Sequence, residues 1–116
     1  MSSRIISINF LLLILSTMTS FSQTAPTHKD IVYATVDGKE LKLDLYIPAK
    51  PVTQGLLVWV HGGAWRGGTK DGVPKVFPES GIATASIEFR QSTEAKFPAQ
   101  IHDIKAAIRF LRANAS

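Results

Sequence analysis

The sequence predicts an α/β fold, in which an antiparallel hairpin precedes a β-α-β-α unit of a mixed, mostly parallel sheet. Three observations lead to this prediction. Residues 41–47 alternate apolar and polar side chains, residues 56–60 form an unbroken apolar run, and residues 97–111 carry apolar side chains three or four positions apart. The first pattern is typical of a strand with one wet face, the second of a fully covered strand, and the third of an amphipathic helix.

The expected hairpin consists of residues 31–36 and residues 41–47. The first segment is rich in β-branched and aromatic residues, which favour strands. An Asp-Gly pair at positions 37–38 is a strong signal for the tight turn between two such strands. Within the second strand, the alternation predicts that Lys42 and Asp44 face water.

The parallel part of the sheet is expected from the next two apolar segments. Residues 56–60 should form a strand that is buried on both faces, and residues 82–89 the following strand. Between them lie a glycine-rich loop, residues 61–72, and a short helix within residues 73–80. The last helix should begin at Pro98, because the first helical position needs no N–H donor.

This last helix should lay one apolar stripe on the sheet. Arg109 and Arg112 sit in its last turns, where they complement the helix dipole, and His102 should lie at its solvent edge. The residues of the expected stripe are Phe97, Ile101, Ile104, Ile108 and Leu111. A helix packed on a sheet in this way agrees with the α/β class.

The first 22 residues have the composition of a secretory signal peptide. Arg4 is their only charged residue, residues 8–15 are apolar except for one asparagine, and small residues precede Gln23. The apolar run is shorter than the roughly 20 residues that a membrane-spanning helix needs, although a retained anchor is the alternative. We therefore expect a secreted or periplasmic protein without stable membrane insertion, in which residues 23–30 form a polar leader.

The amino-acid composition excludes several kinds of functional site. The 116 residues contain no cysteine, so disulfides, thiolate nucleophiles and cysteine zinc ligands are excluded. Lysines and arginines are scattered, so a solvated, mildly basic surface that includes Lys70 is expected, and no nucleic-acid partner. The order Gly68-Thr69-Lys70 does not match a phosphate-binding loop, and no G-x-G dinucleotide motif occurs.

Two sequence blocks carry a family resemblance. Residues 61–65 read HGGAW directly after the apolar strand, and residues 86–90 read SIEFR ahead of the FPAQIHD of residues 97–103. In this order and spacing the chain resembles the α/β-hydrolase superfamily, in its HGG-motif esterase/lipase branch. That branch includes hormone-sensitive-lipase-like and acetyl xylan or feruloyl esterase-like proteins. The resemblance covers residues 31–116, which it implies to be the incomplete N-terminal portion of a hydrolase domain.

The resemblance implies roles for the HGGAW residues. The backbone N–H groups of Gly63 and Ala64 would stabilise the oxyanion of ester hydrolysis. His61, Gly62 and Trp65 would support the loop, and Trp65 would do so by packing beneath it or by lining the acyl pocket. The implied substrate is a small-molecule or polysaccharide-linked ester, with neither a metal nor a cofactor.

Arg90 and Asp103 are interpreted as a buried structural pair that ties a strand to the last helix. No serine lies in a G-x-S-x-G motif, so the nucleophile elbow is absent from the sequence, as are the acid and base expected after it. One hypothesis is therefore an N-terminal fragment of a secreted serine esterase, inactive alone. The alternative is a short non-enzymatic secreted protein, or truncated gene product, that keeps half of the hydrolase fold.

Export predicts a new N-terminus. Residues 1–22 should be removed, because only this stretch combines a positive start, a short apolar middle and a small-residue end. N-terminal sequencing of the exported protein should begin at or near Gln23. A mature protein that still starts at Met1 would contradict this prediction.

Overall fold

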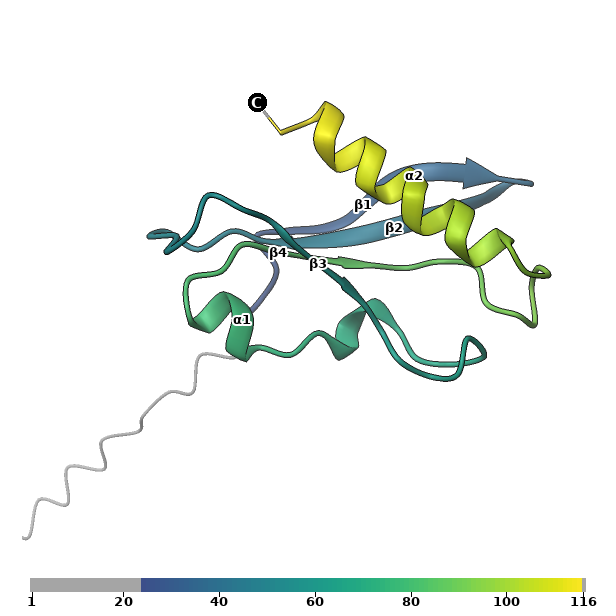
Figure 1. Cartoon of the computed structure of the whole chain (residues 1–116), viewed down its shortest axis with the longest axis horizontal. Coiled ribbons are helices and arrows are strands. Elements are labelled where there is room, and N and C mark those ends of the chain that lie inside the picture. The colour runs from purple at the N-terminus through teal and green to yellow at the C-terminus, as the bar shows by residue number, and fades with distance from the viewer. Residues whose placement is uncertain (1–23, 116) are drawn as a thin grey trace, which may run out of the picture.

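The computed structural model describes residues 24–115, so the signal-peptide prediction for residues 1–22 lies outside the described residues. It contains one four-stranded sheet with strand order β1-β2-β4-β3. Helix α2 lies over one face of the sheet, whereas η1 and α1 lie over the other (Figure 1). In chain order the elements are β1 His28–Val36, β2 Lys39–Tyr46, β3 Leu57–Val60, η1 Lys70–Gly72, α1 Val76–Glu79, β4 Thr84–Ile87 and α2 Ala99–Ala113. The predicted α/β class with a mixed sheet is confirmed.

The predicted hairpin is present. Strands β1 and β2 pair antiparallel, with Val36 opposite Lys39. Asp37 and Gly38 both have positive φ, at 49° and 79°, which suits the right-handed twist of a tight hairpin. Strand β1 begins earlier than predicted, at His28, because His28 pairs with Leu45 of β2.

Strand β4 is the centre of the sheet. It pairs antiparallel with β2 on one side and parallel with β3 on the other, and all four of its residues are buried. Ile87 lies opposite Leu43 of β2 and Val60 of β3. The carboxyl ends of β3 and β4 therefore meet at the same edge of the sheet.

Strand β3 differs from the prediction of full burial. All four of its residues are only half-buried, and the preceding Leu56 is 40% exposed. The reason is position: β3 is the edge of the sheet formed by residues 24–115, so only one of its sides has a neighbouring strand. The apolar character of the segment is nevertheless typical of a strand inside a sheet.

Two predictions about charged side chains on the face of β2 opposite α2 are wrong. Asp44 was expected to face water but is 1% exposed, and Lys70 is 7% exposed rather than solvated. Both are buried because η1 lies against this face and brings the Lys70 ammonium to the Asp44 carboxylate. The face is covered around Asp44, whereas the Lys42 side chain on the same face is 37% exposed, so alternation along β2 describes only part of this face.

Helix α2 starts next to the predicted position, with Pro98 as its N-cap residue. The predicted stripe is confirmed in part, because Ile104 and Leu111 pack against the core. The buried positions are Gln100, Asp103 and Ala107, whereas Phe97 is 80% exposed. A charged residue lies at the centre of the buried face because Asp103 pairs with Arg90. The spacing of apolar residues in a sequence cannot reveal such a pair.

The remaining expectations for helices agree with the structure. The short helix expected between the two parallel strands is α1, and His102 is exposed on α2. The core joins α2 to the hairpin and β4 through Tyr33, Leu41, Leu43, Ile87, Phe89 and Ala107. No helix within residues 24–115 has the length and apolar character needed to cross a membrane.

Candidate functional site

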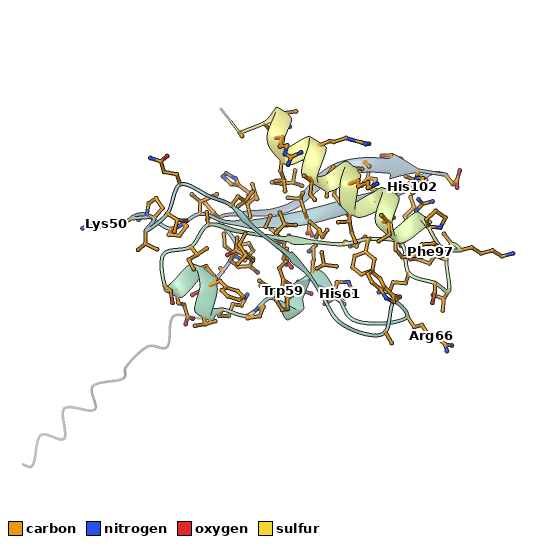
Figure 2. The ribbon with its side chains drawn as sticks, viewed as in Figure 1. Lys50, Trp59, His61, Arg66, Phe97 and His102 are labelled. Atoms are coloured by element: carbon orange, nitrogen blue, oxygen red, sulfur yellow. The ribbon has the colours of Figure 1, made fainter. Side chains whose placement is uncertain are left out.

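Residues 61–69 form the loop that joins the carboxyl end of β3 to η1. Ligand sites of open α/β sheets are commonly found at the carboxyl ends of the strands. In Figure 2 the side chains of Arg66 and Phe97 lie toward one end of the molecule, and His61 lies nearer the middle, close to Trp59. The loop and the residues that follow β4 therefore form the candidate site.

The loop has an unusual backbone. Gly63, Ala64 and Trp65 have consecutive positive φ values of 132°, 53° and 63°. Left-handed φ values cost a residue with a side chain roughly 1–2 kcal/mol, so neighbouring contacts must hold this segment in place. Two such contacts are internal, because the N–H groups of Arg66 and Gly67 both donate to the Gly63 carbonyl at 3.0 Å.

This conformation leaves backbone donors unused. Within residues 24–115, no hydrogen bond is donated by the backbone N–H groups of residues 62–65. The same residues are exposed, so an incoming ligand can reach them. Gly63 and Ala64, the predicted oxyanion donors, are the two central members of this group. Free and fixed N–H groups are what stabilisation of a developing oxyanion requires.

The two halves of the loop are in direct contact at its glycines. A Cβ atom on Gly63 would lie 2.1 Å from the carbonyl oxygen of Gly67. A Cβ atom on Gly68, where φ is 86°, would lie 2.3 Å from the Gly62 carbonyl oxygen and 2.6 Å from Nδ1 of His61. No side chain fits at either position, because real Cβ atoms do not approach other atoms so closely.

His61 lies beneath the loop. Its ring is 8% exposed and stacks on Phe89 with the ring centroids 4.6 Å apart. Nδ1 lies 2.8 Å from the Gly62 carbonyl oxygen, which can only accept, so this nitrogen carries the proton. These contacts place His61 where it can support the loop.

Trp65 contacts Phe89 and also lines a cavity. One edge of its ring meets Phe89, with the centroids 5.5 Å apart. Its side chain is nevertheless 48% exposed, so it is not a core residue. Together with Ala64, Phe97 and Gln100 it lines a cavity of about 320 Å³. Ala64, whose N–H is one of the free donors, is part of the cavity lining.

The structure brings Arg90 and Asp103 together. The Asp103 carboxylate, which is 2% exposed, accepts from the backbone N–H of Arg90 at 2.8 Å and from its Nη2 at 2.8 Å. Nε of Arg90 also donates to it, at 3.0 Å. The hydrogen bonds to Asp103 raise the pKa of the Arg90 guanidinium above its ordinary value. This pair fixes the segment that follows β4 against the first turns of α2.

That segment in turn braces the glycine loop. The N–H of Ser92 donates to the Trp65 carbonyl at 2.7 Å, and Nε2 of Gln91 donates to the Gly68 carbonyl at 3.0 Å. Sequence reasoning missed both residues, together with Lys70 and Phe89. A backbone N–H of serine leaves no signal in a sequence, and a single glutamine or lysine is ordinary on a surface.

The chain is similar to a protein family and to a known esterase. Residues 43–116 match the family model BD-FAE. The chain is 36% identical over 97 residues to an arylesterase of Saccharolobus solfataricus, covering 75% of this chain and 32% of that protein.

Solved structures are similar too. A thermophilic esterase of Thermogutta terrifontis aligns with a TM-score of 0.67 at 30% identity, over 78% of this chain and 35% of the esterase. A bifunctional GH43-CE protein of Bacteroides eggerthii aligns with a TM-score of 0.61 at 41% identity, over 75% of this chain and 13% of that protein. The chain spans about a third of the length of the arylesterase and of the thermophilic esterase.

The contact at Gly68 predicts a large difference between two neighbouring glycines. G68A should destabilise the protein by about 2 kcal/mol or more, because φ is positive and the methyl group would strike the Gly62 carbonyl. G67A should change the free energy of unfolding by less than about 1 kcal/mol, since its Cβ would meet nothing closer than 4.0 Å. Urea denaturation of the two variants, made in the whole protein, measures this difference. Equal stabilities would show that the loop yields at Gly68.

Proposed function

The chain belongs to the BD-FAE family, and from this premise we propose that it supplies the oxyanion-binding part of a serine carboxylic-ester hydrolase. The observation that carries the proposal is the run of backbone N–H groups with no acceptor in residues 24–115, which belong to exposed residues and are centred on Gly63 and Ala64. These donors lie at the carboxyl edge of the parallel strands, where α/β enzymes bind their substrates. The names of the similar proteins, an arylesterase and a thermophilic esterase, support the same reaction class.

The proposed chemistry uses this chain for charge stabilisation. When a hydroxyl oxygen attacks the ester carbonyl carbon, the π electrons of the C=O bond move onto its oxygen. The N–H groups of Gly63 and Ala64 donate to that oxygen, and each such donor is worth about 3 kcal/mol in rate. The general base takes the proton of the attacking hydroxyl; when the intermediate collapses and the C–O bond to the alcohol breaks, the alcohol leaves with that proton. Water then attacks the acyl group left on the nucleophile in the same way, so that the carboxylic acid is released and the hydroxyl regains its proton.

The groups that attack and transfer protons are assigned to other parts of the protein. Within the 116 residues no serine lies in a G-x-S-x-G motif, and the arylesterase is about three times as long as the region that this chain matches. We therefore place the nucleophile, acid and base in segments of the whole protein that correspond to the unmatched part of the relatives. His61 is not the base, because it is buried against Phe89 and bonded to the loop.

The cavity beside Trp65 is proposed to receive the acyl group. Trp65 and Phe97 offer exposed aromatic surface, and Ala64 joins this cavity to the donor groups. Acetyl and feruloyl esters, free or linked to polysaccharide, are the substrates we infer, and secretion or a periplasmic location would give access to a polymer. The name of the Bacteroides eggerthii protein, a bifunctional GH43-CE, supports only that similar units occur in larger enzymes.

The proposal predicts a specific kinetic defect. In the whole protein, G63V should lower kcat for a short-chain nitrophenyl ester by about 100-fold or more, with KM changed much less. The reason is that a side chain at Gly63 would strike the Gly67 carbonyl, turn the donor N–H away, and remove an interaction made chiefly in the transition state. Steady-state kinetics on folded protein measures both constants.

The matched control is G72A. Gly72 is exposed, lies beyond the loop in η1, and has nothing within 4 Å of an added Cβ, so this variant should keep the wild-type constants. An unchanged kcat in folded G63V would show that the loop is structural only. A whole protein without any ester hydrolysis would favour the non-enzymatic alternative.

A further inference from the structure

An ion cluster in which Lys70 and Asp44 are buried and the Asp30 side chain is 49% exposed lies on the face of the sheet opposite α2. The Lys70 ammonium is 2.8 Å from Oδ1 of Asp30 and 3.1 Å from Oδ2 of Asp44. Asp44 is 1% exposed and Lys70 is 7% exposed. The other oxygen of Asp44, Oδ1, accepts from the backbone N–H of Asp30 at 2.8 Å. The three residues come from β1, β2 and η1, so the cluster joins η1 to the hairpin.

An ion cluster of this kind contributes little net free energy to folding. Removing two charges from water costs several kcal/mol, and well-packed apolar residues of similar volume are often as stabilising. The cluster is nevertheless charged in this protein. Burial disfavours the ammonium, but its hydrogen bonds to Asp30 and Asp44 outweigh this effect and raise the pKa of Lys70. The same contact with Lys70 lowers the pKa of Asp30. In some proteins buried ion pairs instead fix the conformation of the segments that bear them.

The backbone that bears Lys70 continues directly into the glycine loop. Oγ of the buried Ser86 in β4 donates to the Lys70 carbonyl at 2.5 Å, so both the side chain and the main chain of Lys70 are fixed. Two residues earlier, Gly68 packs against the Gly62 carbonyl and His61. The Gly67 carbonyl likewise sits against Gly63. Residues 66–69 of the loop therefore pack against residues 62–65, which hold the free N–H donors.

From this arrangement we propose that Lys70, held by Asp30 and Asp44, is the positioning residue of the oxyanion loop. It touches neither substrate nor reacting atoms. It fixes the end of residues 66–70, and these residues hold Gly63 and Ala64 in the conformation that keeps their N–H groups free. The kinetic part of this inference rests on the proposed function, whereas its structural part concerns the loop alone.

Two variants of the whole enzyme separate positioning from stability. K70M removes the ammonium and leaves Asp44 buried and unpaired, so its thermal midpoint should fall. The double variant D44N/K70M removes the two buried charges and leaves the half-exposed Asp30, and the amide oxygen introduced at position 44 can still accept from the Asp30 N–H, so its midpoint should lie above that of K70M. In both variants kcat should fall by about 30-fold, with KM changed less than about 3-fold, because misplaced donors weaken the transition state chiefly.

K75M is the matched control. Lys75 is also a partly buried lysine on this face, and it donates to the Tyr46 hydroxyl at 2.9 Å and lies over that ring. No hydrogen bond or ion pair joins its side chain to residues 61–70 in the described part of the chain, so K75M should keep the wild-type kcat. A double variant D44N/K70M with wild-type kcat would overturn the proposal, since the cluster would then serve stability only.

Hydrogen exchange tests the same proposal without activity. The N–H groups of Arg66 and Gly67, bonded to the Gly63 carbonyl, should exchange about 10-fold faster in D44N/K70M, with Ala85 in β4 unchanged. The milder variant S86A, which removes the hydroxyl bound to the Lys70 carbonyl, should act in the same direction if the charge variants do not fold. Unchanged exchange in the folded variants would overturn the positioning role. A wild-type enzyme without esterase activity would instead refute the proposed function, and this exchange would still decide the role of Lys70.

Discussion

The contact between Gly63 and the Gly67 carbonyl is the constraint on which the rest of the site depends. The loop turns back on itself so closely that the space for a Cβ atom at Gly63 is already occupied. This fold-back lets the Gly63 carbonyl bind the N–H groups of Arg66 and Gly67, while the N–H groups of residues 62–65 remain free of acceptors within residues 24–115. The same turn forces positive φ on Ala64 and Trp65, so free donors and backbone strain have one origin.

Strain of this kind persists only where surrounding groups fix the backbone. His61 and Phe89 support the loop from below, and the segment after β4 binds it through Gln91 and Ser92. That segment is itself held against α2 by the pair of Arg90 and Asp103. The sheet, the helix and the ion cluster of Lys70 thus converge on a loop that contains little regular structure.

Local pattern predicted the fold class, the hairpin and its Asp-Gly turn, because periodicity and turn chemistry are local properties. The HGGAW segment was singled out by its resemblance to a protein family. It was wrong where tertiary partners decide burial. Asp44 alternates as a solvent-facing residue should, but Lys70, 26 positions away, neutralises it within the fold. β3 is less buried than its composition indicates, because burial depends on strand neighbours. Gln91 and Ser92 bind the loop through one side-chain amide and one backbone N–H. No sequence pattern predicts such hydrogen bonds.

The central claim is that Gly63 and Ala64 bind an oxyanion, and one structure tests it most directly. The whole protein would be treated with a phosphonate that bonds to the nucleophile, so that its phosphoryl oxygen occupies the place of the oxyanion. A crystal structure should then show this oxygen about 2.7–3.1 Å from the backbone nitrogens of both residues. A phosphoryl oxygen held by other donors, with these two N–H groups directed away from it, would contradict the account.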